Sequence, residues 1–277
     1  MTDAVRWAAT AAWAGRHGLA LYAGSLALLL AACLASRWLC TSQAARLAAG
    51  GRDNWIGGQA LRTGLAVFAV AAGMFAATAW QLRVNPALSA ADAAFLQALQ
   101  PTVSAPVRQG FGGLTHAADT ATLAVLSIAG AALLLARRQA LLAAGWVLAI
   151  AGNGVLNTTL KQAFGRLRPV QLAGQLAEPG LSFPSGHSSG AVVACGMAAY
   201  LALRLLPARW HLPALLLAVA LALSIGASRL VLQVHFPSDV LAGFASGSAW
   251  LALCITGLGA VRSAGLARQP GGRPPQY

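Results

Sequence analysis

Residues 228–239 read Ser-Arg-Leu-Val-Leu-Gln-Val-His-Phe-Pro-Ser-Asp and lie between two long apolar runs. The stretch puts charged side chains at the boundary of apolar segments, where such side chains usually serve a function. His235 and Asp239 are four residues apart, so on a helix they would share a face and could hydrogen-bond. A carboxylate in that place fixes the tautomer of an imidazole that acts as a nucleophile or a general base. Arg229 adds a planar cation suited to an oxyanion, and the group indicates phosphoryl chemistry.

The composition indicates an integral membrane protein. Hydrophobic residues make up 58% of the chain, charged residues only 9%, and the mean hydropathy is +0.66, which is too apolar for an ordinary soluble domain. The net charge of +13 is spread between apolar runs instead of clustering on one segment, so we expect no nucleic-acid partner. The four cysteines lack metal-ligand spacing and are interpreted as small buried hydrophobic residues.

Seven apolar runs predict membrane-spanning helices, because a span needs about 17–25 mostly apolar residues. They cover residues 19–35, 63–80, 120–136, 139–160, 189–206, 214–227 and 239–260. The first run could also be a cleaved signal peptide or an interfacial segment, but no small-residue cleavage site follows it before Arg37. The expected fold is therefore all-α, a polytopic membrane helical bundle of six core helices and one extra N-terminal helix.

We expect three parts along the chain: an N-terminal extension at residues 1–60, a membrane domain at 61–261 and a disordered basic tail at 262–277. Residues 1–18 and the amphipathic stretch 88–99 are expected to lie at the membrane interface. Residues 36–60 are rich in glycine and arginine and are expected to form a loop. No internal repeat and no separate soluble domain is visible in the sequence.

Three polar segments are predicted to share one side of the membrane. Residues 161–169 and 184–187 lie in one loop, and residues 228–239 follow two spans later, which returns the chain to the same side. If that side is outside, eleven of the 19 basic residues face inward and eight outward, and three of those eight belong to the candidate site. This distribution agrees with the positive-inside rule. We therefore expect a site on the periplasmic or extracellular side of the plasma membrane, the inner membrane of a bacterium, with His235 at the mouth of the bundle.

The same three segments carry a family resemblance. Lys-x6-Arg-Pro at 161–169, Pro-Ser-Gly-His at 184–187 and Ser-Arg-x5-His-x3-Asp at 228–239 resemble, in order and spacing, the signature motifs of the type 2 phosphatidic acid phosphatase (PAP2) superfamily. The resemblance covers roughly the C-terminal two thirds of the chain and leaves out residues 1–60. It implies a metal-independent membrane lipid phosphatase that needs no cofactor and acts through a phosphohistidine.

The resemblance also implies catalytic roles. His235 would attack phosphorus, and Asp239 would orient the ring and stabilise its developing positive charge. His187 would protonate the leaving group and then, as a base, activate the water that hydrolyses the intermediate.

Phosphate binding is assigned by the resemblance to two kinds of group. Lys161, Arg168 and Arg229 would hold the equatorial oxygens, whose charge must be stabilised through the transition state. Ser185 and the backbone N–H groups of Gly186 and His187 would lie where a helix begins, and a helix N-terminus binds phosphate through unpaired amides and the helix dipole.

Further expectations concern polar residues and glycines near the three motifs. Arg166 could assist the phosphate or meet lipid headgroups. Asn153 and Asn157 share a helical face with Lys161, which favours hydrogen bonding between helices. Gly243 and Gly247 have the spacing of a close helix contact.

Several functional alternatives remain open from the sequence. The lipid could be phosphatidylglycerophosphate, phosphatidic acid, undecaprenyl diphosphate or a lipid A phosphate, and phosphate could be transferred to another lipid instead of water. An anion or lipid transporter would leave the pairing of His235 with Asp239 unexplained. A vanadate-dependent haloperoxidase shares the oxyanion pocket of the family but is soluble. The expected partners are a lipid phosphate and the bilayer, and the sequence does not indicate an oligomeric state.

Overall fold

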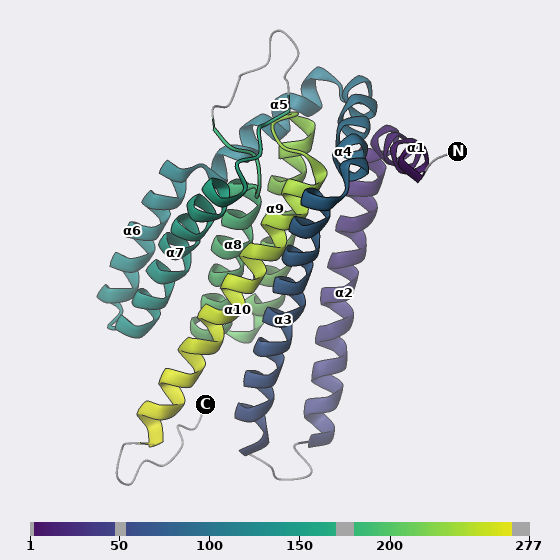
Figure 1. Cartoon of the computed structure of the whole chain (residues 1–277). Coiled ribbons are helices and arrows are strands. Elements are labelled where there is room, and N and C mark those ends of the chain that lie inside the picture. The colour runs from purple at the N-terminus through teal and green to yellow at the C-terminus, as the bar shows by residue number, and fades with distance from the viewer. Residues whose placement is uncertain (1–2, 48–53, 170–179, 268–277) are drawn as a thin grey trace.

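The computed structural model describes residues 3–47, 54–169 and 180–267, and over these residues the chain is a bundle of α-helices (Figure 1). The first five helices are α1 (Asp3–Arg16), α2 (Gly18–Leu47), α3 (Asn54–Val84), α4 (Pro86–Leu99) and α5 (Ala105–Thr115). The second five are α6 (Thr120–Ala136), α7 (Ala140–Phe164), α8 (Gly186–Leu205), α9 (His211–Val231) and α10 (Pro237–Ala267). Short 3-10 turns lie at η1 (Gln100–Thr102), η2 (His116–Ala118) and η3 (Ala208–Trp210).

Six helices in the described part of the chain are long and apolar enough to cross a membrane, and α5 with η2 and α6 forms a seventh candidate that is bent by 47°. The six candidates cover residues 18–35, 61–84, 140–164, 186–205, 208–231 and 237–263. These segments correspond to the seven apolar runs, and the prediction of an all-α polytopic membrane bundle is confirmed. The chain is therefore a multi-pass membrane protein.

Two boundaries differ from the sequence prediction. The expected loop at 36–60 is helical up to Leu47 and again from Asn54, because its alanine, leucine and glutamine residues are good helix formers even where hydropathy is low. The expected disordered tail at 262–277 is helical up to Ala267, since no proline interrupts the chain before residue 270. Residues 268–277 lie outside the described part of the chain.

One end of the bundle carries the short helices α1, α4 and α5 (Figure 1). Asn85 caps α4 by accepting a 3.1 Å bond from the backbone N–H of Ala87, and Pro86 occupies the first helical position, where its missing N–H costs nothing. α1 packs closely against α4, because a Cβ on Gly15 would come within 2.3 Å of the Phe95 carbonyl oxygen. The interfacial placement of these two segments stays a prediction.

The contact of α8 with α10 depends on two glycines. A Cβ on Gly243 would lie 2.6 Å from the Ser185 carbonyl oxygen, and a Cβ on Gly247 would lie 2.7 Å from the Ser189 carbonyl oxygen. Any larger residue would push the helices apart, so the predicted close contact is confirmed.

The asparagines of α7 hydrogen-bond to the start of α8. Asn153 Nδ2 donates to Ser189 Oγ at 3.3 Å, and Asn157 Nδ2 donates to the Pro184 carbonyl at 3.4 Å. These bonds confirm the predicted polar contact between helices.

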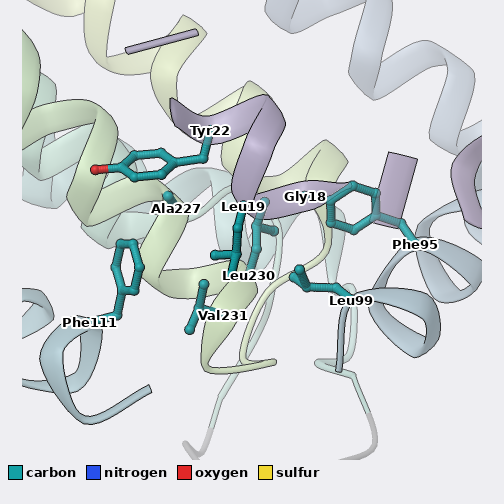
Figure 2. Close-up of a pocket in the computed structure, with 9 residues that line it drawn as sticks. All are labelled: Gly18, Leu19, Tyr22, Phe95, Leu99, Phe111, Ala227, Leu230 and Val231. Carbon is teal, nitrogen blue, oxygen red and sulfur yellow. The ribbon is translucent and has the colours of Figure 1, made fainter. Parts of the chain in front are cut away.

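A small apolar cavity separates the start of α2 from α4, α5 and α9 (Figure 2). Its lining is Gly18, Leu19, Tyr22, Phe95, Leu99, Phe111, Ala227, Leu230 and Val231. On α9, Ala227 and Val231 lie about 160° around the helix from Arg229, at 100° per residue. The cavity therefore opens on the face of α9 that faces away from the candidate phosphate site.

Candidate active site

The first motif begins at the end of α7 and turns back over the bundle. Gly165 ends α7 with a left-handed backbone, φ 62°, a conformation that glycine adopts without strain. Beyond this turn, Leu167 forms an isolated bridge with Leu181, and the N–H of Ser182 donates to the Arg166 carbonyl at 2.7 Å. Lys161 Nζ donates to the Leu181 carbonyl at 2.8 Å. The lysine of the first motif is thus tied to the segment that leads into the second.

The second motif forms the start of α8. Ser185 is fully buried and caps the helix, its Oγ accepting a 3.3 Å bond from the Ser188 N–H. Gly186 is the first helical residue, and a Cβ there would lie 2.9 Å from Asn157 Oδ1. The predicted helix start at this motif is confirmed.

The third motif connects α9 to α10. Gln233 has φ 60°, which turns the chain sharply so that Asp239 falls in the first turn of α10. The Asp239 carboxylate accepts a 2.9 Å bond from the Phe236 N–H, the reciprocal bond of a capping box. His235 Nδ1 lies 3.5 Å from Asp239 Oδ2.

His235 is fully buried, with an exposed fraction of 0%. The expectation that it lies at the mouth of the bundle is wrong, because the histidine that follows the turn at Gln233 is enclosed by the protein. The preceding residue is held by Arg168, which donates from Nη1 to the Val234 carbonyl at 3.3 Å. Arg229 is equally buried, and its Nη1 donates to Thr115 Oγ1 of α5 at 2.7 Å.

Asp239 joins all three motifs. Its backbone carbonyl accepts a 3.0 Å bond from the Ser185 N–H of the second motif. Arg166 of the first motif donates from Nη1 to Oδ1 at 2.7 Å, while Ser182 Oγ donates to Oδ2. The orientation of His235 therefore depends on contacts from every motif.

Arg166 bridges two carboxylates. Besides Asp239, it contacts Asp92 of α4, with Nη2 2.8 Å from Oδ2, and its guanidinium carbon lies 4.3 Å from the centre of the Phe236 ring. Of the two roles considered from the sequence, a phosphate contact or a headgroup contact, neither describes this bridge between α4 and α10.

Asp92 was not found by the sequence reasoning. It is buried, with an exposed fraction of 3%, and it accepts a 3.1 Å bond from the Ser238 N–H. Burial raises the pKa of the Asp92 carboxyl, although the bonds from Ser238 and Arg166 oppose the rise. An acidic residue in an otherwise apolar stretch, in a chain with only 6 acidic residues, was the available signal.

His187 is joined to a second missed acid. Its Nε2 lies 2.8 Å from Asp119 Oδ1, and the other oxygen of Asp119 lies 2.7 Å from His116 Nδ1. Asp119 connects η2 to α6, so two imidazoles share one carboxylate at this end of the bundle.

The electrostatic setting of His235 favours the neutral imidazole. Burial, the largest cause, and the positive charges of Arg168 and Arg229 together lower the pKa of His235 to about 4, although Asp239 opposes the shift. Among the described residues, His235 Nε2 is a buried nitrogen with no hydrogen-bond partner. With Nδ1 directed at Asp239, Nε2 carries the lone pair, which is the arrangement that a nucleophilic imidazole requires.

We expect the acid limb of kcat/KM to follow this lowered pKa. If His235 is the nucleophile, it can attack only as the neutral imidazole. Activity should then persist as the pH falls through about 6.5, the ordinary pKa of histidine, and be lost as the pH falls through about 4. The measurement is kcat/KM from about pH 3 to pH 8, corrected for the titration of the lipid phosphate by ³¹P NMR. An acid limb that stays near 6.5 after this correction contradicts the assignment.

Comparison with known proteins shows which proteins this chain resembles. Residues 140–262 match the family model of the PAP2 superfamily. Phosphatidylglycerophosphatase B of Bacillus subtilis (strain 168) is 33% identical over 143 residues, which are 49% of this chain and 67% of that relative. Lipid A 1-phosphatase of Rhizobium johnstonii is 36% identical over 112 residues, 36% of this chain and 41% of that relative.

A solved structure is also similar. It is the crystal structure of a transmembrane PAP2 type phosphatidylglycerolphosphate phosphatase from Bacillus subtilis, with a TM-score of 0.60 and 29% identity over 69% of this chain and 94% of that chain. A multi-pass helical bundle with a buried His235–Asp239 pair at one end is a membrane phosphatase. The chain belongs to the PAP2 superfamily, and the matched family model covers the segment that carries all three motifs.

Proposed function

We propose that the protein hydrolyses the terminal phosphate of a membrane lipid, a phosphomonoester or a diphosphate, through a phosphohistidine at His235. The observation that supports this proposal most is the buried His235–Asp239 pair, which contacts from the other two motifs hold in place through Asp239. Neither a binding protein nor a transporter needs a neutral, buried imidazole with one nitrogen committed to a carboxylate.

In the first half of the reaction, Nε2 of His235 attacks phosphorus as the bond from phosphorus to the leaving oxygen breaks. The Asp239 carboxylate accepts a hydrogen bond from the Nδ1–H and offsets the positive charge that the ring gains. His187 gives its proton to the leaving oxygen. Lys161, Arg168 and Arg229, with the amides at the start of α8, stabilise the equatorial oxygens of the transferred group.

In the second half, water attacks the phosphorus of the phosphohistidine. His187, which lost its proton in the first half, takes one from the water, and the bond from phosphorus to Nε2 breaks. Inorganic phosphate leaves and neutral His235 is restored. The backbone amides of Gly186 and His187 serve both halves, because a phosphoryl group occupies the same place in each.

We propose phosphatidylglycerophosphate as the first lipid to test. The curated relative of which this chain covers the larger share is a phosphatidylglycerophosphatase, while phosphatidic acid, undecaprenyl diphosphate and lipid A phosphates carry the same terminal group. In our proposal the site lies at headgroup depth on the outer face of a bacterial inner membrane. A lipid can then enter sideways and keep its hydrocarbon tails in the bilayer.

Chelation provides the first test of the proposed chemistry. Cationic side chains and a helix N-terminus hold the phosphate, and among the described residues no group of three or more His, Cys, Asp or Glu could hold a metal ion. We therefore expect phosphate release from these lipids by detergent-purified protein to be unchanged in EDTA. Magnesium added back after chelation is the control, and a loss in EDTA that magnesium restores would count decisively against the proposal.

A further inference from the structure

We propose that Asp119 is the positioning residue of His187. This inference rests on the proposed function, in which His187 is the acid of the first half and the base of the second. It extends that function by giving the second histidine its own carboxylate partner, at the N-cap of α6 and outside all three motifs.

Asp119 has the backbone position of a helix cap, but its side chain does not cap the helix. Asp119 occupies the N-cap position of α6, with φ −61° and ψ 148°, yet its side chain makes no capping hydrogen bond to that helix. An aspartate at an N-cap normally accepts a hydrogen bond from a backbone amide of its own first turn. Here Oδ1 instead lies 2.8 Å from His187 Nε2 on α8. The carboxylate therefore contacts α8 instead of capping α6.

The surrounding packing holds Asp119 in this place. The chain bends by 47° where η2 meets α6, which brings the N-terminal end of α6 next to the first turn of α8. Ala118, the preceding residue, is buried in a cluster with Ala191 of α8 and Ile225 of α9. The position of the carboxylate is thus determined by the same helices that position the phosphate site.

This contact has a chemical consequence. With Nε2 bonded to the carboxylate, the proton that His187 exchanges with the leaving group or with water must be carried by Nδ1. When His187 takes a proton from water, its ring becomes positive beside the cationic phosphate ligands, and the nearby carboxylate offsets that charge. Asp119 therefore does for the acid–base histidine what Asp239 does for the nucleophile.

The test compares leaving groups, because only acid catalysis depends on them. The leaving group of a lipid phosphomonoester is an alkoxide, which needs a proton. The leaving group of p-nitrophenyl phosphate is a stabilised phenolate, which does not. We expect Asp119→Asn to lower kcat/KM for the lipid monoester by about 10–100-fold and to lower it much less for the aryl ester. Since kcat/KM reports steps up to the departure of the leaving group, hydrolysis of the intermediate does not affect the comparison.

Three further variants make the test specific. Asp119→Ser keeps a residue that can cap α6 but removes the carboxylate, so it should reproduce the selective loss even where Asp119→Asn folds poorly. Asp119→Glu should recover part of the activity. His116→Gln removes the other imidazole on the same carboxylate and should leave the ratio of the two substrates near the wild-type value.

The outcomes separate this inference from the proposed function. Equal losses on both substrates in Asp119→Asn and Asp119→Ser, or a selective loss in His116→Gln, would overturn the role of Asp119. A His187→Ala variant without any leaving-group dependence would instead show that the proposed role of His187 is wrong. A selective loss in His187→Ala that is absent from the Asp119 variants would overturn the inference and leave the proposed function standing.

Discussion

Replacement of His235 by alanine is expected to reduce phosphate release by about 10⁴-fold or more, because the remaining groups can hold the phosphate but supply no nucleophile in its place. The measurement is release of inorganic phosphate at saturating lipid in detergent. Since His235 is fully buried, alanine also leaves a cavity, and we expect a lower Tm with the helical content retained.

A matched control is His211→Ala. His211 lies at the other end of α9, where its Nε2 bonds the Leu206 carbonyl at 2.9 Å, and we expect this variant to keep wild-type activity. If folded His235→Ala released phosphate at the wild-type rate, the nucleophile would have to be another residue.

Replacement of His187 by alanine is expected to trap a phosphoprotein when the substrate is a lipid diphosphate. The leaving group of a lipid diphosphate is a lipid phosphate, which needs less protonation than an alkoxide. The first half of the reaction therefore proceeds without His187, while the second half lacks its base. We expect the trapped phosphate, isolated by rapid quenching, to be labile in acid and stable in base. Mapping by mass spectrometry should place it on His235.

The roles of the two histidines can be tested in the same experiment. His235→Ala should trap no phosphate under identical conditions. Covalent phosphate on the His235→Ala protein, or phosphate mapped to His187 in the wild type, would show that the two roles are reversed.

The membrane fold could be predicted from the sequence because hydropathy reports directly on the bilayer. Each predicted span matches one of the described helices, with no predicted end more than one residue outside it, and α8 begins at Gly186, where the family resemblance implied a helix start. The errors at residues 36–60 and 262–267 have one cause. A polar but alanine-rich stretch remains a good helix, and hydropathy does not measure helix propensity.

The sequence predicted that the three motifs would meet on one side of the bundle, but it predicted a specific pair only where the residues lie close together in the chain. His235 and Asp239 are four residues apart, but Arg166 meets Asp92 across 74 positions and His187 meets Asp119 across 68. Such contacts depend on how helices pack, and no local pattern in the sequence encodes them. The burial of His235 was missed for a related reason. It follows a left-handed turn at Gln233, and no glycine in the sequence indicates that turn.

The contact of α8 with α10 limits how such a protein can be recombined with its relatives. Gly243 and Gly247 allow the backbone of Ser185 and Ser189 to approach α10, and the Ser185 N–H is also bonded to the carbonyl of Asp239. A chimaera that takes the segment around Ser185 from a relative but keeps its own α10 would bring together two helix surfaces whose side chains do not fit each other. Residues 185–189 and 239–247 are therefore a single unit of inheritance, although about fifty residues of chain, including all of α9, separate them.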